Sequence, residues 1–135
     1  MTYLLDTNIC IYIINEQPAQ VLQRVIQAGR DSLAISTVTV AELAFGVAKS
    51  TRADSRAKLE NFLSKFPILD WDQNAAWVYG NVRKNLEAKG QRIGERDLLL
   101  ACQALALDAT MVTNNIREFE RVEGLKLENW VGVST

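Results

Sequence analysis

Short β-forming runs alternate along the whole chain with longer segments in which apolar residues recur at helical spacing. The runs are rich in leucine, isoleucine and valine, and they cover residues 3–5, 32–35, 68–69, 110–112 and 125–127. Strands that are separated by helices pair in parallel, and the helices then cover both faces of the sheet. We therefore predict an α/β fold, a three-layer α/β/α sandwich with a central, mostly parallel sheet of four to five strands.

The helical segments have recognisable boundaries. We predict helices over residues 9–13, 21–28, 40–47, 53–66, 74–89 and 98–107, and a further helical turn at 117–119. Either Ser36 or Thr37 is expected to cap the third helix and Asp72 the fifth, because short polar side chains accept hydrogen bonds from the first free N–H groups. Asp6 and Asp97 stand in front of the first and the sixth helix. The sixth is apolar nearly all round, so we expect it to be buried.

The composition is that of one globular domain. The chain has 135 residues, of which 48% are hydrophobic and 23% charged, and this balance excludes a disordered chain. We expect a single domain over residues 1–135. No uncharged apolar run reaches the roughly 18 residues of a membrane helix, and the N-terminus lacks the features of a signal peptide, so we expect a cytoplasmic protein without membrane contact. Cys10 and Cys102 are expected to be reduced core residues, since neither has a metal-ligand neighbour.

The absence of histidine narrows the possible chemistry. It excludes imidazole-dependent acid–base catalysis, Ser-His-Asp triads and zinc sites that need imidazole. Catalysis by this chain must then rest on carboxylates, amides, hydroxyls or a metal ion. The formal net charge of −1 provides no overall basic field that would point to a nucleic-acid partner, so the local distribution of charge has to be considered instead.

Polar residues follow the predicted strands at the edge of the sheet where ligands bind in such folds. Asp6 comes directly after the first strand, Thr113 and Asn115 follow the fourth, and Glu42 lies about two turns beyond the second. Asp97 joins them because its helix leads to the strand before Asn115. Each residue also has a purely structural explanation: the two aspartates as helix caps, Glu42 as a surface residue and Asn115 as part of a turn.

The combination of these residues indicates a metal site. Carboxylates gathered in one crevice repel one another and raise one another's pKa unless a cation neutralises them. Mg²⁺ and Mn²⁺ prefer oxygen ligands and keep several waters, so a few carboxylates with an amide or hydroxyl oxygen suffice. Asp6, Asp97, Glu42 and Asn115 supply such a set. A helix N-terminus at each aspartate keeps the carboxylate ionised, so capping and metal binding are compatible.

Four motifs in order along the chain carry a family resemblance. They are Leu5-Asp6-Thr7-Asn8, Ala41-Glu42-Leu43-Ala44-Phe45-Gly46, Ile93-Gly94-Glu95-Arg96-Asp97-Leu98-Leu99-Leu100-Ala101 and Val112-Thr113-Asn114-Asn115-Ile116-Arg117-Glu118-Phe119. With these motifs the chain resembles the PIN-domain nucleases and, closely, the VapC toxins of bacterial toxin–antitoxin pairs. The resemblance covers nearly the whole chain. It implies a PIN-like sandwich and a Mg²⁺-dependent endoribonuclease that acts on RNA such as a tRNA anticodon stem-loop. Mn²⁺ is expected to substitute for Mg²⁺.

The resemblance also implies roles for the individual residues. Asp6 and Asp97 would bind the metal, Glu42 would serve as a third ligand or as a base acting through water, and Thr113 and Asn115 would be orienting groups in the catalytic site. Asn115 departs from the family pattern, which often has an aspartate at this position. Glu118 is a candidate for the missing charge, and the number of metal ions, one or two, stays open.

The resemblance implies partners as well. VapC-like toxins are typically homodimers, and a cognate VapB-like antitoxin wraps the toxin with its C-terminal segment and covers the acidic pocket in a toxin–antitoxin hetero-oligomer. Apolar residues that suit either a dimer surface or the core are Ile11, Tyr12, Ile14 and Phe45. Basic residues that suit either RNA or the antitoxin are Lys49, Arg52, Arg56 and Lys58.

Two further interpretations remain open at this point. The segment 83–96 holds five basic and two acidic residues, which makes it either a phosphate-binding rim or a solvated helix face. A degenerate PIN domain would bind RNA without cleaving it, because Asn115 lowers the acidic charge. A phosphorylation-receiver domain would use Asp70 as the phosphoacceptor, but it needs a lysine after the last strand, where Glu128 and Asn129 stand.

Overall fold

A computed structural model describes residues 1–131 of the chain and contains one five-stranded parallel sheet. Its strands are β1 (Tyr3–Leu5), β2 (Leu33–Ser36), β3 (Ile68–Leu69), β4 (Thr110–Val112) and β5 (Lys126–Glu128). They lie in the order β3-β2-β1-β4-β5, and every neighbouring pair is parallel. The predicted parallel sheet is confirmed, at the upper end of the expected strand number.

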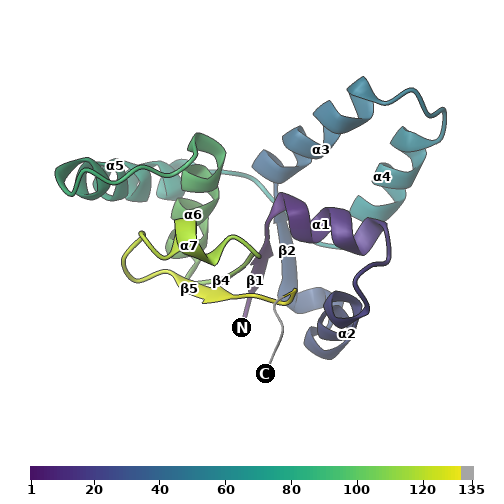
Figure 1. Cartoon of the computed structure of the whole chain (residues 1–135), viewed down its shortest axis with the longest axis horizontal. Coiled ribbons are helices and arrows are strands. Elements are labelled where there is room, and N and C mark those ends of the chain that lie inside the picture. The colour runs from purple at the N-terminus through teal and green to yellow at the C-terminus, as the bar shows by residue number, and fades with distance from the viewer. Residues whose placement is uncertain (132–135) are drawn as a thin grey trace.

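Seven α-helices flank this sheet in the described part of the chain. They are α1 (Thr7–Ile14), α2 (Ala19–Ala28), α3 (Thr37–Lys49), α4 (Ser55–Leu63), α5 (Gln73–Ala88), α6 (Glu95–Leu107) and α7 (Ile116–Phe119), with a short 3₁₀ turn at Arg30–Ser32. Figure 1 shows α1, α3 and α4 on one side of the strands and α5 and α6 on the other. No helix within residues 1–131 is long and apolar enough to cross a membrane.

Alternate residues of the strands face opposite layers. Leu5 and Val112 are buried in a cluster with residues of α1, α2, α3 and α4, whereas Leu4 and Met111 are buried in a second cluster with residues of α6 and α7. Helix α5 packs on the outside of α6 through a third cluster around Leu86. Each such leucine or valine stabilises the fold by about 1.5–3 kcal/mol on full burial. This alternation gives the predicted three-layer α/β/α sandwich.

Three helix caps lie where the sequence predicts them. The side chain of Asp6 accepts a hydrogen bond from the N–H of Ile9 at 2.9 Å, so Asp6 caps α1. Ser36, rather than Thr37, caps α3, with its hydroxyl 3.0 Å from the nitrogen of Val38. Asp72 caps α5. Each cap satisfies an N–H group that the helix itself leaves free.

The predicted start of the sixth helix is wrong by three residues, and this changes the place of Asp97. Helix α6 begins at Glu95 with Gly94 as its N-cap, so Asp97 lies in the first turn instead of in front of the helix. The N–H of Leu98 bonds the carbonyl of Gly94 at 2.8 Å and closes this turn. The prediction that α6 is buried is confirmed, since six of its residues from Leu98 to Ala104 are buried. The fourth helix ends at Leu63, earlier than residue 66.

The two cysteines confirm a further prediction. Cys10 and Cys102 are both free and buried. Cys10 belongs to the first core cluster and Cys102 to the cluster between α5 and α6, so they lie in different layers of the sandwich. Burial raises the pKa of the Cys102 thiol to about 11. Both thiols are therefore protonated packing residues at neutral pH.

Candidate functional site

Asp6 lies at the carboxyl end of β1, in the centre of the sheet. Its backbone N–H bonds the carbonyl of Val112 at 3.1 Å, which holds it beside the end of β4. The residue is 5% exposed. Burial raises the pKa of Asp6, while a hydrogen bond from the Thr113 hydroxyl and the N–H of Ile9 counteract this rise. Asp6 is thus a largely buried carboxylate that is oriented by both its helix and the neighbouring strand.

Thr113 and Asn115 follow β4 directly and support Asp6 from the other side. Thr113 is fully buried, and its Oγ1 accepts a hydrogen bond from the N–H of Asn115 at 2.9 Å. The same hydroxyl therefore donates to Asp6 and accepts from the backbone that leads into α7. The expectation that Thr113 is an orienting residue agrees with this pair of contacts, which leaves its hydroxyl no rotational freedom.

Glu42 projects from α3 toward the start of α1. The Thr7 hydroxyl donates to Glu42 Oε1 at 3.0 Å, and Arg96 Nε lies 3.5 Å from Glu42 Oε2. The side chain of Glu42 is 24% exposed. The interpretation of Glu42 as a solvated surface residue is therefore wrong: its position facing α1 and α6 removes most of its surface from water and brings it next to both aspartates.

Asp97 and Glu118 converge above Gly94. A β-carbon placed on Gly94 would lie 3.3 Å from Glu118 Oε1 and 3.6 Å from Asp97 Oδ2. The N–H of Gly94 donates to Glu118 Oε1, and Asn115 Nδ2 donates to Glu118 Oε2 at 2.9 Å. A side chain at residue 94 would crowd these two carboxylate oxygens, which approach one point above the N-terminus of α6, where the helix dipole favours negative charge.

The electrostatics show that the four carboxylates form one group. The pKa of Asp97 is raised to about 6, by burial first and then by the negative charges of Glu118, Asp6 and Glu42. Arg96 acts in the opposite direction. An open cavity of about 420 Å³ lies beside them, and its lining residues are Glu42, Gly94, Glu95, Arg96 and Asp97. The structure thus brings together the predicted residues from four different elements of the fold.

The donor set fits a hard divalent cation that keeps most of its water. Within residues 1–131, no three Asp, Glu or Cys side chains are placed so that together they could hold a metal ion. Glu42 is drawn toward Thr7 and Arg96, and Glu118 toward Gly94 and Asn115, while Asp6 and Asp97 remain close enough to influence each other. Mg²⁺ needs only one or two carboxylates because waters complete its octahedron. The residues therefore suit Mg²⁺ or Mn²⁺ better than a metal that requires a closed site.

The predicted basic rim is partly neutralised by its own neighbours. Arg83 pairs with Glu87 at 3.0 Å, Lys89 with Glu123 at 2.7 Å, and Arg96 with Glu42. Arg92 makes no ion pair within the described residues, although its carbonyl accepts a hydrogen bond from Arg121. Within the described residues, the basic residues of this segment without an ion pair are therefore Lys84 and Arg92, while Arg96 is paired with Glu42 but has a 67% exposed side chain.

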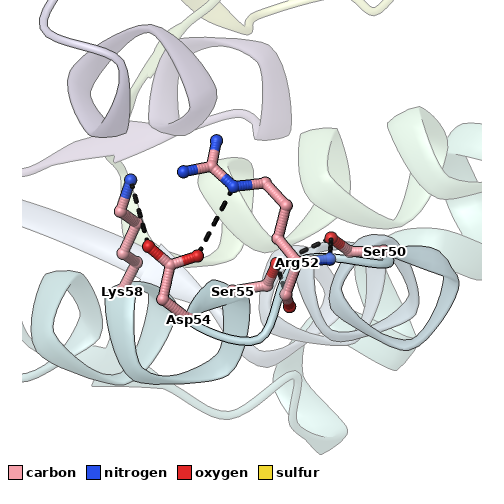
Figure 2. Close-up of polar contacts among 5 residues, drawn as sticks. All are labelled: Ser50, Arg52, Asp54, Ser55 and Lys58. Atoms are coloured by element: carbon pink, nitrogen blue, oxygen red, sulfur yellow. Dashed lines mark hydrogen bonds and ion pairs between the residues drawn. The ribbon is translucent and has the colours of Figure 1, made fainter.

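The second basic group lies at the connection between α3 and α4. Figure 2 shows Asp54 between Arg52 and Lys58, at 3.4 Å from Arg52 Nε and 3.7 Å from Lys58 Nζ. The hydroxyls of Ser50 and Ser55 lie 2.7 Å apart and tie the two helix ends together. This group therefore serves in part to hold the loop in place.

Of the four apolar residues that suit either a dimer surface or the core, two pack against the core and two are exposed. Tyr12 and Ile14 pack against the core, as one of the two interpretations predicted. Ile11 is 39% and Phe45 60% exposed, so these two remain available to a partner. Ile11 and Ile14 also line an open groove of about 350 Å³ that runs between α1, α3 and α4 and reaches Glu42 at one end.

Sequence reasoning did not assign a role to two polar residues of the site. Thr7 holds Glu42 by a hydrogen bond, and Arg96 holds it by an ion pair. The sequence feature that could have identified them is their position next to the two aspartates, since Thr7 directly follows Asp6 and Arg96 directly precedes Asp97. Gly94 is a third such residue, because its missing β-carbon makes room for the two carboxylates.

Comparisons with known proteins agree with this geometry. The family model of the PIN domain matches residues 3–125. The chain is 46% identical to Ribonuclease VapC2 of Rickettsia felis over 96% of this chain and 98% of that protein. It is 40% identical to the tRNA(fMet)-specific endonuclease VapC of Shigella flexneri, again over 96% of this chain and 98% of that protein. It also superimposes on a chain in the crystal structure of VapBC2 from Rickettsia felis bound to a promoter DNA fragment, with a TM-score of 0.90 and 44% identity, over 96% of this chain and 99% of that one.

Proposed function

Because this chain belongs to the PIN-domain family and is similar over nearly its whole length to VapC ribonucleases, we propose that it is a metal-dependent endoribonuclease that hydrolyses RNA phosphodiester bonds. In this proposal residues 1–135 form one PIN domain that acts as the toxin of a type II toxin–antitoxin pair in the cytoplasm. The observation that carries the proposal is the convergence of Asp97 with Glu118, Asp6 and Glu42, whose negative charges raise the pKa of Asp97, since a bound cation would relieve this repulsion.

Asp6 and Asp97 are the proposed metal ligands, and Glu42 is either a third ligand or a base that acts through a water. The proposed ion is Mg²⁺, which Mn²⁺ can replace. Such an ion, when bound, polarises a phosphodiester oxygen and makes a nearby water more acidic. Glu118 supplies the fourth acidic charge, because it lies beside Asp97 and is held there by the N–H of Gly94. With Glu118 in this place, the charge that Asn115 lacks is present one turn further along the chain, which argues against a domain that binds RNA without cleaving it.

The remaining side chains orient the reacting groups. Thr113 orients Asp6 through its hydroxyl hydrogen bond, which counteracts the rise of the Asp6 pKa that burial causes. Thr7 fixes Glu42 Oε1, and where Glu42 acts as the base, Oε2 would take a proton from the attacking water once Arg96 turns away from it. Arg96 lies beside that same oxygen and is 67% exposed, and a guanidinium in this place can turn to a phosphate group. Asn115 Nδ2 holds Glu118 Oε2.

A structured RNA is the proposed substrate, and a tRNA anticodon stem-loop is the proposed target. The support for tRNA is the 40% identity to the tRNA(fMet)-specific endonuclease of Shigella flexneri. The partner is a VapB-like antitoxin, as in the VapBC complex of Rickettsia felis on which the chain superimposes. The groove between α1, α3 and α4 ends at Glu42, so a segment bound there would also cover the acidic cavity. We propose a homodimer of this chain within that hetero-oligomer. The family match leaves no support for the phosphorylation-receiver interpretation.

The decisive experiment incubates the purified protein with total tRNA and sequences the cut ends. Cleavage at one or a few anticodon loops is expected with Mg²⁺ or Mn²⁺ and is expected to stop with EDTA. The Asp6→Asn variant, purified in the same way, controls for a contaminating nuclease. Cutting that survives the chelator, or that is equal in wild type and variant, would contradict the proposed mechanism.

A further inference from the structure

A second cavity lies directly beside the acidic one, between α5 and the segment that leads into α6. It has a volume of about 750 Å³, within the range of sites that hold a nucleotide-sized ligand. Leu86, Ile93 and Leu98 form an apolar floor, and they belong to the cluster that joins α5 to α6. Tyr79 and Arg83 lie along its α5 wall. The cavity is therefore apolar at its base, and its sides combine the Tyr79 ring with two arginines and two glutamates, of which Glu87 is paired with Arg83.

The two cavities share a wall. Glu95 lines both of them. Ile93, which lines the larger cavity, is followed in the chain by Gly94, which lines the acidic cavity and lies beside Asp97 and Glu118. A polynucleotide whose phosphate lies at Asp97 would therefore reach the larger cavity with an adjacent nucleotide. Both cavities are open to solvent and Glu95 lines both, so one strand can contact the two of them.

The lining of the larger cavity matches the chemistry of one nucleotide. A planar base can lie on Leu86 and Ile93 with Tyr79 beside it, and base–aromatic stacking in single-strand sites is worth about 1–3 kcal/mol per base. Arg83 donates to the Tyr79 hydroxyl at 3.1 Å, and its guanidinium lies 6.0 Å from the Tyr79 ring centroid, which keeps the ring in place. Arg92, which has no ion pair within residues 1–131, can neutralise a phosphate at the rim.

We propose that this cavity is a subsite that takes one unstacked base of the RNA, next to the phosphate that is cut. The subsite rests on the proposed ribonuclease function and adds to it the element that selects the position of cleavage. Sequence-selective recognition of RNA favours splayed bases in loops, because paired bases hide the edges and faces that a protein can contact. A base held beside Tyr79 fixes which phosphodiester bond reaches Asp97.

The test measures binding of the full chain, in EDTA so that the RNA stays intact, to a fluorescent hairpin with the anticodon stem-loop of initiator tRNA. The same hairpin is made with a single abasic nucleotide at each loop position in turn. One abasic position is expected to weaken binding to the wild-type protein by about 5- to 100-fold, as the loss of one stacked base predicts. With Tyr79→Ala the intact hairpin is expected to bind as weakly, and that same abasic position to have no further effect.

Matched controls lie on the same helix and at the opposite edge of the sheet. Trp77→Ala removes an aromatic side chain of α5 that is 73% exposed and does not line the cavity, and it should leave the abasic effect unchanged. Arg92→Ala should lower the slope of log K against log salt by about 0.7, as the loss of one contact to a single-stranded phosphate predicts. Arg30→Ala, at an exposed arginine before β2 and so at the opposite edge of the sheet, should leave the slope unchanged. Tyr79→Leu, which retains apolar bulk, replaces Tyr79→Ala if the latter has no cooperative unfolding transition.

The outcomes separate the subsite from the ribonuclease proposal. The subsite is overturned if the wild-type protein does not bind the intact hairpin, if it binds every abasic hairpin as tightly as the intact one, or if the abasic effect persists in both Tyr79 variants. Loss of the subsite with metal-dependent tRNA cleavage intact leaves the proposed function standing. Absence of any cleavage with Mg²⁺ overturns the ribonuclease proposal itself.

Discussion

The side-chain amide of Asn115 donates a hydrogen bond to Glu118, with Nδ2 2.9 Å from Oε2. The other oxygen of Glu118 accepts the N–H of Gly94 and lies on the same side as Asp97 Oδ2. Asn115 thus holds in place a glutamate from one turn further along the chain. Glu118 brings next to Asp97 a negative charge that residue 115 does not carry.

Removing the charge at residue 118 and adding one at residue 115 should therefore change the affinity for Mg²⁺ in opposite directions. Glu118→Gln is expected to weaken Mg²⁺ binding by about 10- to 100-fold, the usual effect of losing a group that supports the metal ligands. Asn115→Asp is expected to strengthen it and to lower the stability of the metal-free protein, because two carboxylates would then face each other. Isothermal titration with Mg²⁺ and thermal melts in EDTA measure both effects.

Glu120→Gln is the matched control for this pair. Glu120 follows α7 directly and is exposed, so its loss removes the same charge from the same turn without touching the site. Equal Mg²⁺ affinities for Glu118→Gln and Glu120→Gln would show that Glu118 is only part of the surface charge.

Asp97→Asn should abolish cleavage and at the same time stabilise the metal-free protein at neutral pH. The folded-state pKa of Asp97 is about 6, above its ordinary value of 3.8, because burial and three neighbouring carboxylates disfavour its charged form. Ionisation of Asp97 is therefore less favourable in the folded state than in the unfolded chain, and this difference lowers the free energy of unfolding at neutral pH. Asparagine removes the charge with little change in shape. Melting in EDTA at pH 7.5 should give a higher Tm for the variant than for the wild type.

The pH dependence of this difference follows from the sign of the shift. As the pH rises from about 4 to 6, the unfolded chain loses the Asp97 proton first, so the stability of the wild-type protein falls relative to the variant. The difference in Tm should be near zero at pH 4 and reach its full size above pH 6. A variant that is less stable than the wild type at pH 7.5 in EDTA would mean that Asp97 is held by attractive contacts instead.

The site residues differ in how far they could be predicted from the sequence, and the reason is the range of the interactions. Asp6, Ser36 and Asp72 were identified as caps because a short polar side chain in front of an apolar helical pattern is a local signal. The start of α6 was missed because Gly94 caps the helix without a side chain, so Glu95 and Arg96 carry no mark of being helical.

The contacts of Glu42 and Glu118 depend on the tertiary structure. Thr7 is 35 residues from Glu42, and Gly94 is 24 residues from Glu118, so only the packed fold brings either pair together. The sequence could name Glu42 through its motif, but it could not show that an arginine beside Asp97 would pair with it. The basic segment 83–96 posed the same difficulty in part, because Lys89 and Arg96 pair with Glu123 and Glu42 from other parts of the fold. The pair of Arg83 with Glu87 is a local i,i+4 contact within α5.

Arg96→Gln should strengthen Mg²⁺ binding and weaken RNA binding. Arg96 Nε lies 3.5 Å from Glu42 Oε2, so its positive charge competes with a cation for this carboxylate. Without it, we expect Mg²⁺ to bind several-fold more tightly, and the slope of log K against log salt for a single-stranded RNA to fall by about 0.7. Arg56→Gln, on α4 and paired with Glu60, controls for the loss of one exposed arginine. Unchanged Mg²⁺ and RNA affinities in Arg96→Gln would remove Arg96 from the site.

Thr113→Val should lower both stability and the rate of cleavage. The substitution keeps the shape of the side chain but removes a buried hydroxyl that donates to Asp6 and accepts the N–H of Asn115. Both partners would then be left with an unsatisfied group, which costs about 1–3 kcal/mol. We also expect kcat to fall by about 10- to 100-fold, since Asp6 loses the group that orients it. Urea unfolding and tRNA cleavage measure the two effects.

A second buried threonine provides the control for this substitution, because it separates the loss of a hydrogen bond from a poor fit of valine in the core. Thr39 in α3 is also fully buried, but its hydroxyl has no hydrogen-bond partner within the described residues. Removing an unpartnered buried hydroxyl recovers its desolvation cost, so Thr39→Val should leave the free energy of unfolding unchanged or raise it. Similar losses in the two variants would show that valine is simply poorly accommodated in this core. A loss confined to Thr113→Val, with kcat reduced and Mg²⁺ affinity weakened, ties the effect to the hold of the Thr113 hydroxyl on Asp6.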